Sequence, residues 1–134
     1  MNGGAFMDIV FSPRATPPAG HYSQAVRANG FLFVSGQLGF LSRHGSGAPA
    51  RLADGIAAQT EAALASLGAI LEAAGAGPGA VASVTVYVAD IAHWPEVNRA
   101  YERYFGAHRP ARTVVPCGAL HYGALVEISA IAVA

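Results

Sequence analysis

The chain has 134 residues, with eight basic and eight acidic side chains, so its formal net charge is zero and only 12% of its residues are charged. A neutral chain without a basic cluster is not expected to bind DNA or RNA, because nucleic-acid binding relies on clustered positive charge. All the basic residues are arginines, and the absence of lysine excludes a Schiff-base lysine and a Walker lysine.

The cysteine content and the hydropathy pattern are typical of a cytoplasmic protein. Cys117 is the sole cysteine, so no intrachain disulfide is expected. No signal-like segment and no long apolar run is visible, so we expect no membrane association. The length predicts a single domain over residues 1–134. Apolar residues make up 53% of this short chain, which indicates that some apolar surface is buried between subunits.

The first part of the chain is predicted to form short strands. The dipeptide Asn29-Gly30 is a strong signal for a tight hairpin between two of them. Residues 12–20 contain three prolines and are predicted as a loop. Residues 39–51 are rich in glycine and are predicted as a mobile surface loop. The predicted strands are residues 6–11, 23–28 and 31–35.

Residues 55–74 have the clearest helical periodicity in the chain. Asp54 is a candidate N-cap, and Gly75 is well placed to end the helix in a left-handed conformation. One face of this helix is apolar. The opposite, polar face is predicted to carry three side chains, Gln59, Glu61 and Glu72.

A second helix is predicted over residues 95–106, where Pro95 suits the first turn. Its predicted buried stripe is Val97, Tyr101, Tyr104 and Phe105. The alternating or β-branched segments 81–89, 112–117 and 125–133 are predicted as strands. This order of elements predicts an α+β fold, a single sheet with two helices packed on one face.

Three polar clusters lie within or at the ends of the apolar strands. Arg112 offers a planar guanidinium suited to a carboxylate, although a structural ion pair is the commoner role of such an arginine and a solvated strand start is a further alternative. Glu127 lies in a predicted strand whose apolar residues alternate around it. Its side chain is therefore either on the solvent face or buried for a chemical purpose. The third cluster, residues 35–37 (Ser-Gly-Gln), supplies neutral donors or forms a plain turn.

Other candidate residues give weaker signals. The five histidines show no ligand-like pairing, so no metal site is expected. Tyr22 and Tyr122 are either core residues or hydroxyls of a site, and the pattern does not decide between these roles. No Gly-x-Ser-x-Gly motif surrounds Ser35, so a serine hydrolase is not supported.

Seven segments, in order and over nearly the whole chain, resemble the Rid family of enamine and imine deaminases, also called the YjgF-like family. They are residues 20–26 (GHYSQAV), 34–37 (VSGQ), 59–75 (QTEAALASLGAILEAAG), 84–90 (VTVYVAD), Val97-Asn98 with Tyr101 and Phe105, 109–113 (RPART), and 126–128 with 130–132 (VEI, AIA).

The resemblance implies a chorismate-mutase-like α+β unit that forms a homotrimer with clefts between subunits. It implies cofactor-free hydrolysis of small 2-enamino or 2-imino acids to 2-keto acids and ammonia. In that reaction Arg112 would hold the substrate carboxylate and Glu127 would activate the attacking water. Tyr22, Ser35 and Asn98 match family positions that line the cleft.

The chain departs from the family pattern at several positions near the expected cleft. His21 replaces a proline, Ser66 an asparagine and Val114 a cysteine, while residues 38–41 (Leu-Gly-Phe-Leu) replace a segment that usually contains Pro and Asp. These departures put the substrate in question. Phe40 and His21 are candidates for shaping a pocket for a larger or different imine.

Two other functions stay open from the sequence. A trimer could bind a small carboxylate through the same Arg112 without turnover, as a regulatory module. An endoribonuclease or translation inhibitor is the other alternative, an activity also attributed to the family, but the zero net charge weighs against it.

Overall fold

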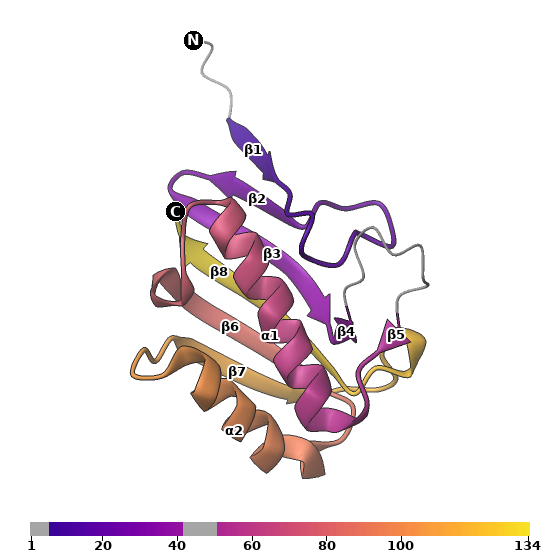
Figure 1. The fold of residues 1–134 in the computed structure, drawn as a ribbon. Helices are drawn as coiled ribbons and strands as arrows, with labels where there is room; N and C mark the ends of the chain where they lie inside the picture. The colour runs from indigo at the N-terminus through magenta and orange to yellow at the C-terminus, as the bar shows by residue number, and fades with distance from the viewer. Residues whose placement is uncertain (1–5, 42–50) are drawn as a thin grey trace.

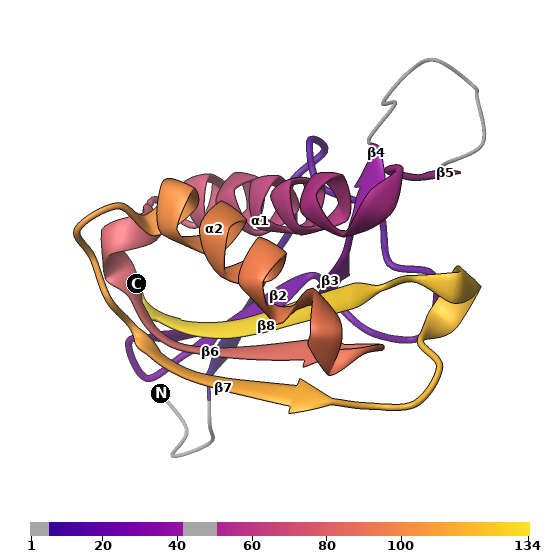
Figure 2. The ribbon, with the colours of Figure 1, turned by 90° about the horizontal axis from the view of Figure 1, so that it is seen from below.

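The computed structural model describes residues 6–41 and 51–134, and these form a six-stranded sheet with two helices on one face (Figures 1 and 2). The sheet order is β1-β2-β3-β8-β6-β7. Only β6 and β7 pair in parallel, so the sheet is mixed. The strands are β1 (Met7–Val10), β2 (Ala25–Ala28), β3 (Phe31–Leu38), β6 (Val81–Val88), β7 (Ala111–Pro116) and β8 (Val126–Val133).

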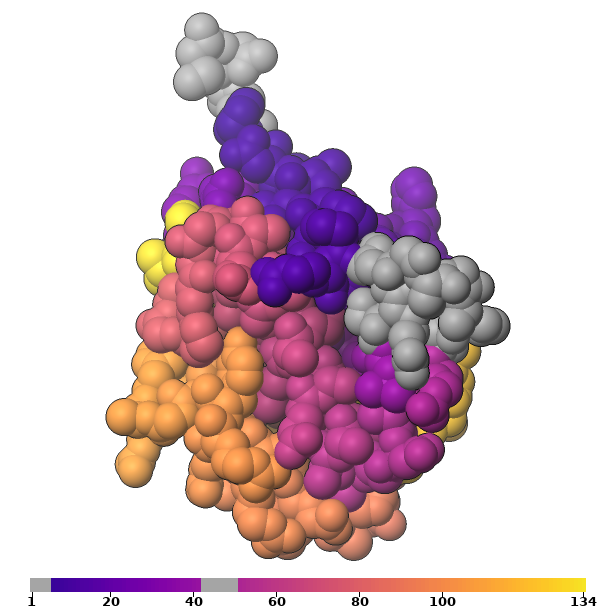
Figure 3. Space-filling model, viewed as in Figure 1, coloured from indigo at the N-terminus to yellow at the C-terminus, as the bar shows by residue number. Residues whose placement is uncertain are grey.

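The helices are α1 (Gly55–Ala73) and α2 (Trp94–Phe105), and three short 3-10 turns are η1 (Pro78–Ala80), η2 (Ile91–His93) and η3 (His121–Gly123). The predicted α+β class, the two helices on one face and every predicted strand are confirmed. In Figure 3 the helices and loops cover the sheet on the side that faces the viewer. No helix of the described residues is long and apolar enough to cross a membrane.

The predicted loop 39–51 contains a second, two-stranded sheet that the sequence analysis did not anticipate. Its strands are β4 (Phe40–Leu41) and β5 (Arg51–Leu52), which pair antiparallel. Residues 42–50 lie outside the described residues, so the predicted mobility of that part stays a prediction. The tight turn at Asn29-Gly30 is confirmed, with φ angles of 51° and 81°.

Helix α1 starts at the predicted residue and ends as predicted, but the predicted side-chain cap at its start is not formed. Gly75 has a φ of 77°, and its N–H donates to the Glu72 carbonyl at 2.9 Å, while the Ala76 N–H donates to the Leu71 carbonyl at 2.8 Å. This pair of bonds is the Schellman motif. Asp54 occupies the N-cap position, but its side chain accepts no cap hydrogen bond. The next residue, Gly55, has a φ of 86°, so the chain does not enter the helix with the geometry that brings a cap side chain over the first amides.

Gln59 is not on the polar face of α1, contrary to the prediction. It is 5% exposed, its Nε2 donates to the Ala53 carbonyl at 3.1 Å, and its Oε1 accepts from the Leu125 N–H at 2.9 Å. The amide therefore ties the start of α1 to the start of β8. Glu61 and Glu72 are exposed as predicted.

The core lies between the helices and the sheet. α2 contributes its predicted stripe, with Val97, Tyr101 and Phe105 buried and Tyr104 half-buried. Burying each large apolar side chain stabilises the fold by about 1.5–3 kcal/mol. Completely or almost completely buried side chains from α1, β6 and β8 include Leu64, Leu67, Ile70, Leu71, Val84, Val86, Val88, Val126 and Ile128.

The part of the sheet face away from the helices that lies over β1, β2, β3 and the end of β8 is apolar and uncovered in the single chain. The strand register aligns Ile9, Val26, Phe33 and Ile131 in one row across β1, β2, β3 and β8. Ile9 is 74% exposed and Phe33 is 46% exposed. Apolar strand faces of this extent normally pack against another layer.

Candidate functional site

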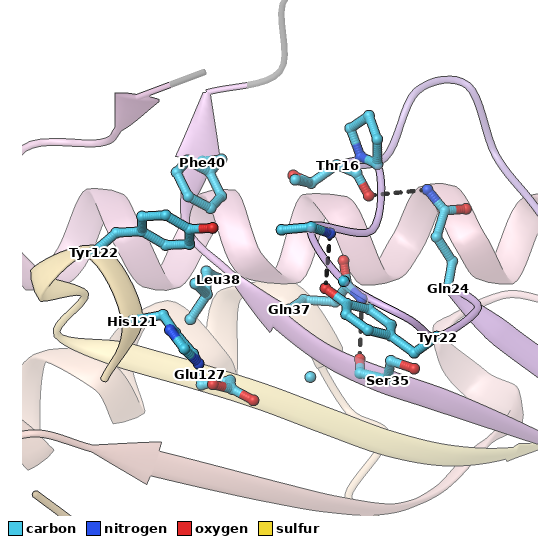
Figure 4. A pocket seen from close by; sticks show the side chains of 14 residues that line it. Thr16, Tyr22, Gln24, Ser35, Gln37, Leu38, Phe40, His121, Tyr122 and Glu127 are labelled. Carbon is cyan, nitrogen blue, oxygen red and sulfur yellow. Dashed lines mark hydrogen bonds between the residues drawn. The ribbon is translucent and has the colours of Figure 1, made fainter. Parts of the chain in front are cut away.

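A cavity of about 480 Å³ opens beside the end of β3 and the start of β8 (Figure 4). Its walls come from three segments far apart in sequence: the loop of residues 16–24, the end of β3 with Phe40, and the turn η3. Glu127 and Ser35 contribute to its floor. The volume lies in the range of small-molecule sites.

Glu127 reaches this cavity because of its place in β8. Its neighbours Val126 and Ile128 are fully buried toward the helices, so alternation turns Glu127 to the opposite face. The register of β3 against β8 shifts between Val34 and Gln37, and Gly36 lies in this irregularity. A Cβ atom at Gly36 would overlap the Glu127 carboxylate, so any other residue there would displace that side chain from the place it occupies.

Ser35 and Tyr22 line the same cavity as Glu127. The Ser35 hydroxyl donates to the Ser23 carbonyl at 2.6 Å, which leaves the serine oxygen free to accept. The Tyr22 hydroxyl accepts from the Ala19 N–H at 3.3 Å, which leaves its proton free to be donated. The pair therefore offers one acceptor and one donor near Glu127.

Arg112 belongs to a second polar group, formed with one face of α2. Its guanidinium lies between the rings of Trp94 and Tyr101, 4.6 Å from each centroid. Its Nη1 donates to the Asn98 Oδ1 at 3.0 Å. Burial raises the pKa of the Tyr101 hydroxyl, and the nearby Arg112 charge partly opposes that rise.

The ion pair considered for Arg112 is not found among the described residues. Arg14 pairs with Glu72 and Arg103 pairs with Glu61, but Arg112 meets only the neutral Asn98 and the two rings. Arg112 is also exposed, so its remaining N–H groups are available to a carboxylate. Within residues 6–41 and 51–134, no three His, Cys, Asp or Glu side chains are grouped as metal ligands.

Comparison with known proteins assigns the chain to a family. The family model described as "Endoribonuclease L-PSP" matches residues 13–134. The chain is 38% identical over 125 residues to a RutC family protein of Pyrococcus horikoshii, an alignment that covers 93% of this chain and 96% of that protein. The chain belongs to the Rid family.

Other members of the Rid family extend this result. A Bos taurus protein named 2-iminobutanoate/2-iminopropanoate deaminase is 39% identical, with 93% of this chain and 88% of that protein covered. The structure of E. coli TdcF with bound serine has a TM-score of 0.85 at 28% identity, and the match covers 95% of this chain and 98% of that one.

The five site residues predicted for this Rid-family chain fall into two separate groups. Tyr22, Ser35 and Glu127 line the cavity, whereas Arg112 contacts Asn98 on α2. β6 lies between β7 and β8. In the register of these strands, Arg112 is level with Val84 and Glu127 with Tyr87, three positions further along β6.

The two groups also lie on opposite faces of the sheet. Arg112 is level with Val84, which is buried beneath the helices, and it contacts α2. Glu127 faces the other way, into the cavity. One chain therefore does not bring Arg112 and Glu127 to the same small molecule.

Two buried glutamines hold the cavity wall. Gln24 is 2% exposed, and its amide spans the loop by accepting from the Ser12 N–H at 2.7 Å and donating to the Thr16 carbonyl at 3.0 Å. Gln37 donates to the Ser35 carbonyl at 2.9 Å and accepts from the Ser66 hydroxyl at 2.7 Å. Gln37 was a candidate donor to a ligand, but this amide is engaged in the scaffold.

Two positions that depart from the family pattern were candidates for shaping the pocket, and the structure places only one of them in the cavity wall. His21 is exposed and does not line the cavity, whereas Phe40 does. Sequence reasoning left Tyr122 undecided. It lines the cavity, is 64% exposed and has a φ of 62°, and a left-handed tyrosine is not signalled by any local sequence pattern.

Proposed function

We propose that this Rid-family chain hydrolyses 2-enamino and 2-imino acids to 2-keto acids and ammonia, without a cofactor, at clefts between subunits of a homotrimer. The observation that carries the proposal is a matched pair of half-sites. One is an arginine held between two rings with no carboxylate partner among the described residues, and the other is a carboxylate at the floor of an open cavity.

The chemistry needs only positioning and proton transfer. Arg112 holds the substrate carboxylate through two parallel hydrogen bonds. Glu127 accepts a proton from the attacking water as the oxygen bonds to the imine carbon, and the former imine nitrogen gains a proton. As the carbon–nitrogen bond breaks, the hydroxyl proton is transferred to the departing nitrogen, so that ammonia leaves and the 2-keto acid remains. Water supplies the new oxygen, so the reaction balances without an oxidant.

A second copy of the chain supplies the missing half of each site. The exposed apolar face of the sheet, which includes Phe33 and Ile131, offers a surface for such assembly. A ring of copies placing Arg112 of one chain beside the Glu127 cavity of the next would complete every cleft. The deaminase name of the Bos taurus relative and the serine in TdcF support a substrate shaped like an amino acid.

RNA cleavage is favoured less, despite the description of the family model. The net charge is zero, and two of the arginines, Arg14 and Arg103, are already paired with glutamates. Binding to a phosphate backbone depends on free clustered cations. A binding module without turnover would share Arg112, so turnover has to be measured directly.

A coupled assay tests the proposal. An amino-acid oxidase generates the imine, and semicarbazide traps whatever the protein does not remove. Wild type should accelerate imine loss, and Arg112→Ala should lower kcat/KM about a hundredfold, because two charge-assisted hydrogen bonds are lost. Arg112→Lys should recover little, since a point charge does not replace the planar fork. Absence of any acceleration by wild type over several parent amino acids would reject the deaminase.

Co-expression of two inactive variants tests the shared site. Arg112→Ala and Glu127→Gln, produced together, should form mixed trimers in which one cleft of three carries both intact side chains, or about one quarter of the clefts when unmixed trimers are included. Activity well above that of either variant alone is expected. If the mixed assemblies are as inactive as the single variants, each site is built from one chain and the shared cleft is wrong.

A further inference from the structure

The outer part of the cavity is lined by aromatic rings that the proposed reaction does not use. Phe40 and Tyr122 meet edge to face, with centroids 5.5 Å apart and an interplanar angle of 69°. Figure 4 shows these two rings together on one side of the cavity and Tyr22 on the other. Leu38 completes the apolar wall.

Two of these rings combine exposure with a place in the cavity wall. Tyr122 is 64% exposed and Tyr22 is 51% exposed, although both line a cavity. Tyr122 also has a φ of 62°, a conformation that costs free energy for a non-glycine residue and is found at ligand-binding positions. The turn η3 therefore holds the Tyr122 ring beside the cavity with part of the ring surface uncovered.

The charge and the size of the cavity limit which substrate side chains can bind against this aromatic wall. Glu127 is the only carboxylate among the described residues that line the cavity, so an acidic side chain on the substrate would be repelled. The cavity of about 480 Å³, before a second copy closes it, has room for a side chain larger than that of an alanine-derived imine. Aromatic rings prefer edge-to-face or offset contacts with other rings, which the Phe40–Tyr122 pair can extend to a third.

We infer that the cavity selects imino acids with an aromatic side chain, which lies against Phe40 and Tyr122. This inference rests on the proposed function, because Glu127 at the floor of the same cavity places the reacting carbon. The rings set specificity and take no part in proton transfer.

A comparison of two imine substrates tests the inference. The imines of phenylalanine and alanine are generated in parallel, and kcat/KM is compared for each. We expect wild type to favour the phenylalanine-derived imine at least about tenfold. Phe40→Ala and Tyr122→Ala should each lower that ratio about fivefold to tenfold, through loss on the aromatic substrate alone.

Matched controls separate a lost ring from a damaged fold. Tyr122→Phe keeps the ring and should keep the preference. Phe6→Ala removes a ring that is 74% exposed and lies outside the cavity, so it should change neither substrate. The rate on the alanine-derived imine serves as the internal measure of folding for every variant.

The possible results decide the inference separately from the proposed function. Equal use of both imines by wild type, or an unchanged ratio in Phe40→Ala and Tyr122→Ala, overturns the aromatic preference while leaving the deaminase in place. If wild type hydrolyses neither imine, the proposed function fails, and calorimetry with phenylpyruvate and pyruvate then tests the cavity. Tighter binding of phenylpyruvate that is lost in Phe40→Ala supports ring recognition, and equal binding rejects it.

Discussion

The Arg112 group and the Glu127 cavity lie on opposite faces of the sheet and are positioned by different kinds of structure. Arg112 is oriented by regular elements, because Trp94, Asn98 and Tyr101 recur along one face of α2 and meet one position of β7. Glu127 depends on irregular backbone, namely the register shift at Gly36 and the left-handed turn at Tyr122. Regular helix and strand geometry is therefore enough to orient a guanidinium that can hold a carboxylate, whereas the Glu127 side chain needs an irregularity in the sheet to have room.

Among changes to the two half-sites, replacement of the Glu127 carboxylate should lower activity the most. Glu127→Gln keeps the shape of the side chain but removes the proton acceptor, so we expect kcat to fall about a thousandfold. Binding of pyruvate, measured by calorimetry, should change little, because Arg112 still holds the carboxylate. An unchanged kcat would show that Glu127 is not the base and that the cavity only binds.

Adding a side chain at Gly36, in the irregular part of β3, should have the next largest effect on activity. Gly36→Ala places a Cβ where the Glu127 carboxylate lies, and a displacement of about 1 Å can lower activity by about a hundredfold. Gly77→Ala is the matched control, because a Cβ there meets nothing within 4 Å. If both variants retain full activity in the coupled assay, Gly36 does not position Glu127.

Removal of one ring beside the guanidinium should weaken the other half-site more modestly. Trp94→Leu loses a stacking contact 4.6 Å from the Arg112 carbon Cζ, so KM should rise about fivefold to tenfold with kcat less affected. Trp94→Phe retains a ring and should recover most of the loss. A fall in kcat with an unchanged KM would mean that Trp94 acts on the chemical step and not on substrate binding.

The smallest effect is expected on stability, from the buried hydrogen bond behind the cavity wall. Ser66→Ala leaves the Gln37 Oε1 without the hydroxyl at 2.7 Å and should lower the free energy of unfolding by about 1–3 kcal/mol. Glu61→Ala removes an exposed ion pair with Arg103 and should cost less than about 1 kcal/mol. Urea unfolding at one protein concentration measures both, and equal losses would mean that the buried bond is not the stronger support.

Part of the candidate site was predictable because strand alternation is a local property. The apolar residues on either side of Glu127 already indicate that it faces away from the buried side of its strand. The resemblance to the Rid family added Tyr22, Ser35 and Asn98, and the structure places the first two in the cavity and Asn98 against Arg112. Burial of Gln59 was missed, since a glutamine on a helix is usually solvated and only the partner carbonyl of Ala53 and amide of Leu125 reveal its role.

Local sequence preferences were enough to predict which segments form helices or strands and where several of them end. The turn at Asn29-Gly30 and the end of α1 at Gly75 depend on backbone angles that those residues favour locally. Only the tertiary structure decided that β6 separates β7 from β8, and hence that Arg112 and Glu127 are kept apart in one chain. The physical reason is that strand order and packing depend on contacts between residues distant in sequence, which no local preference encodes.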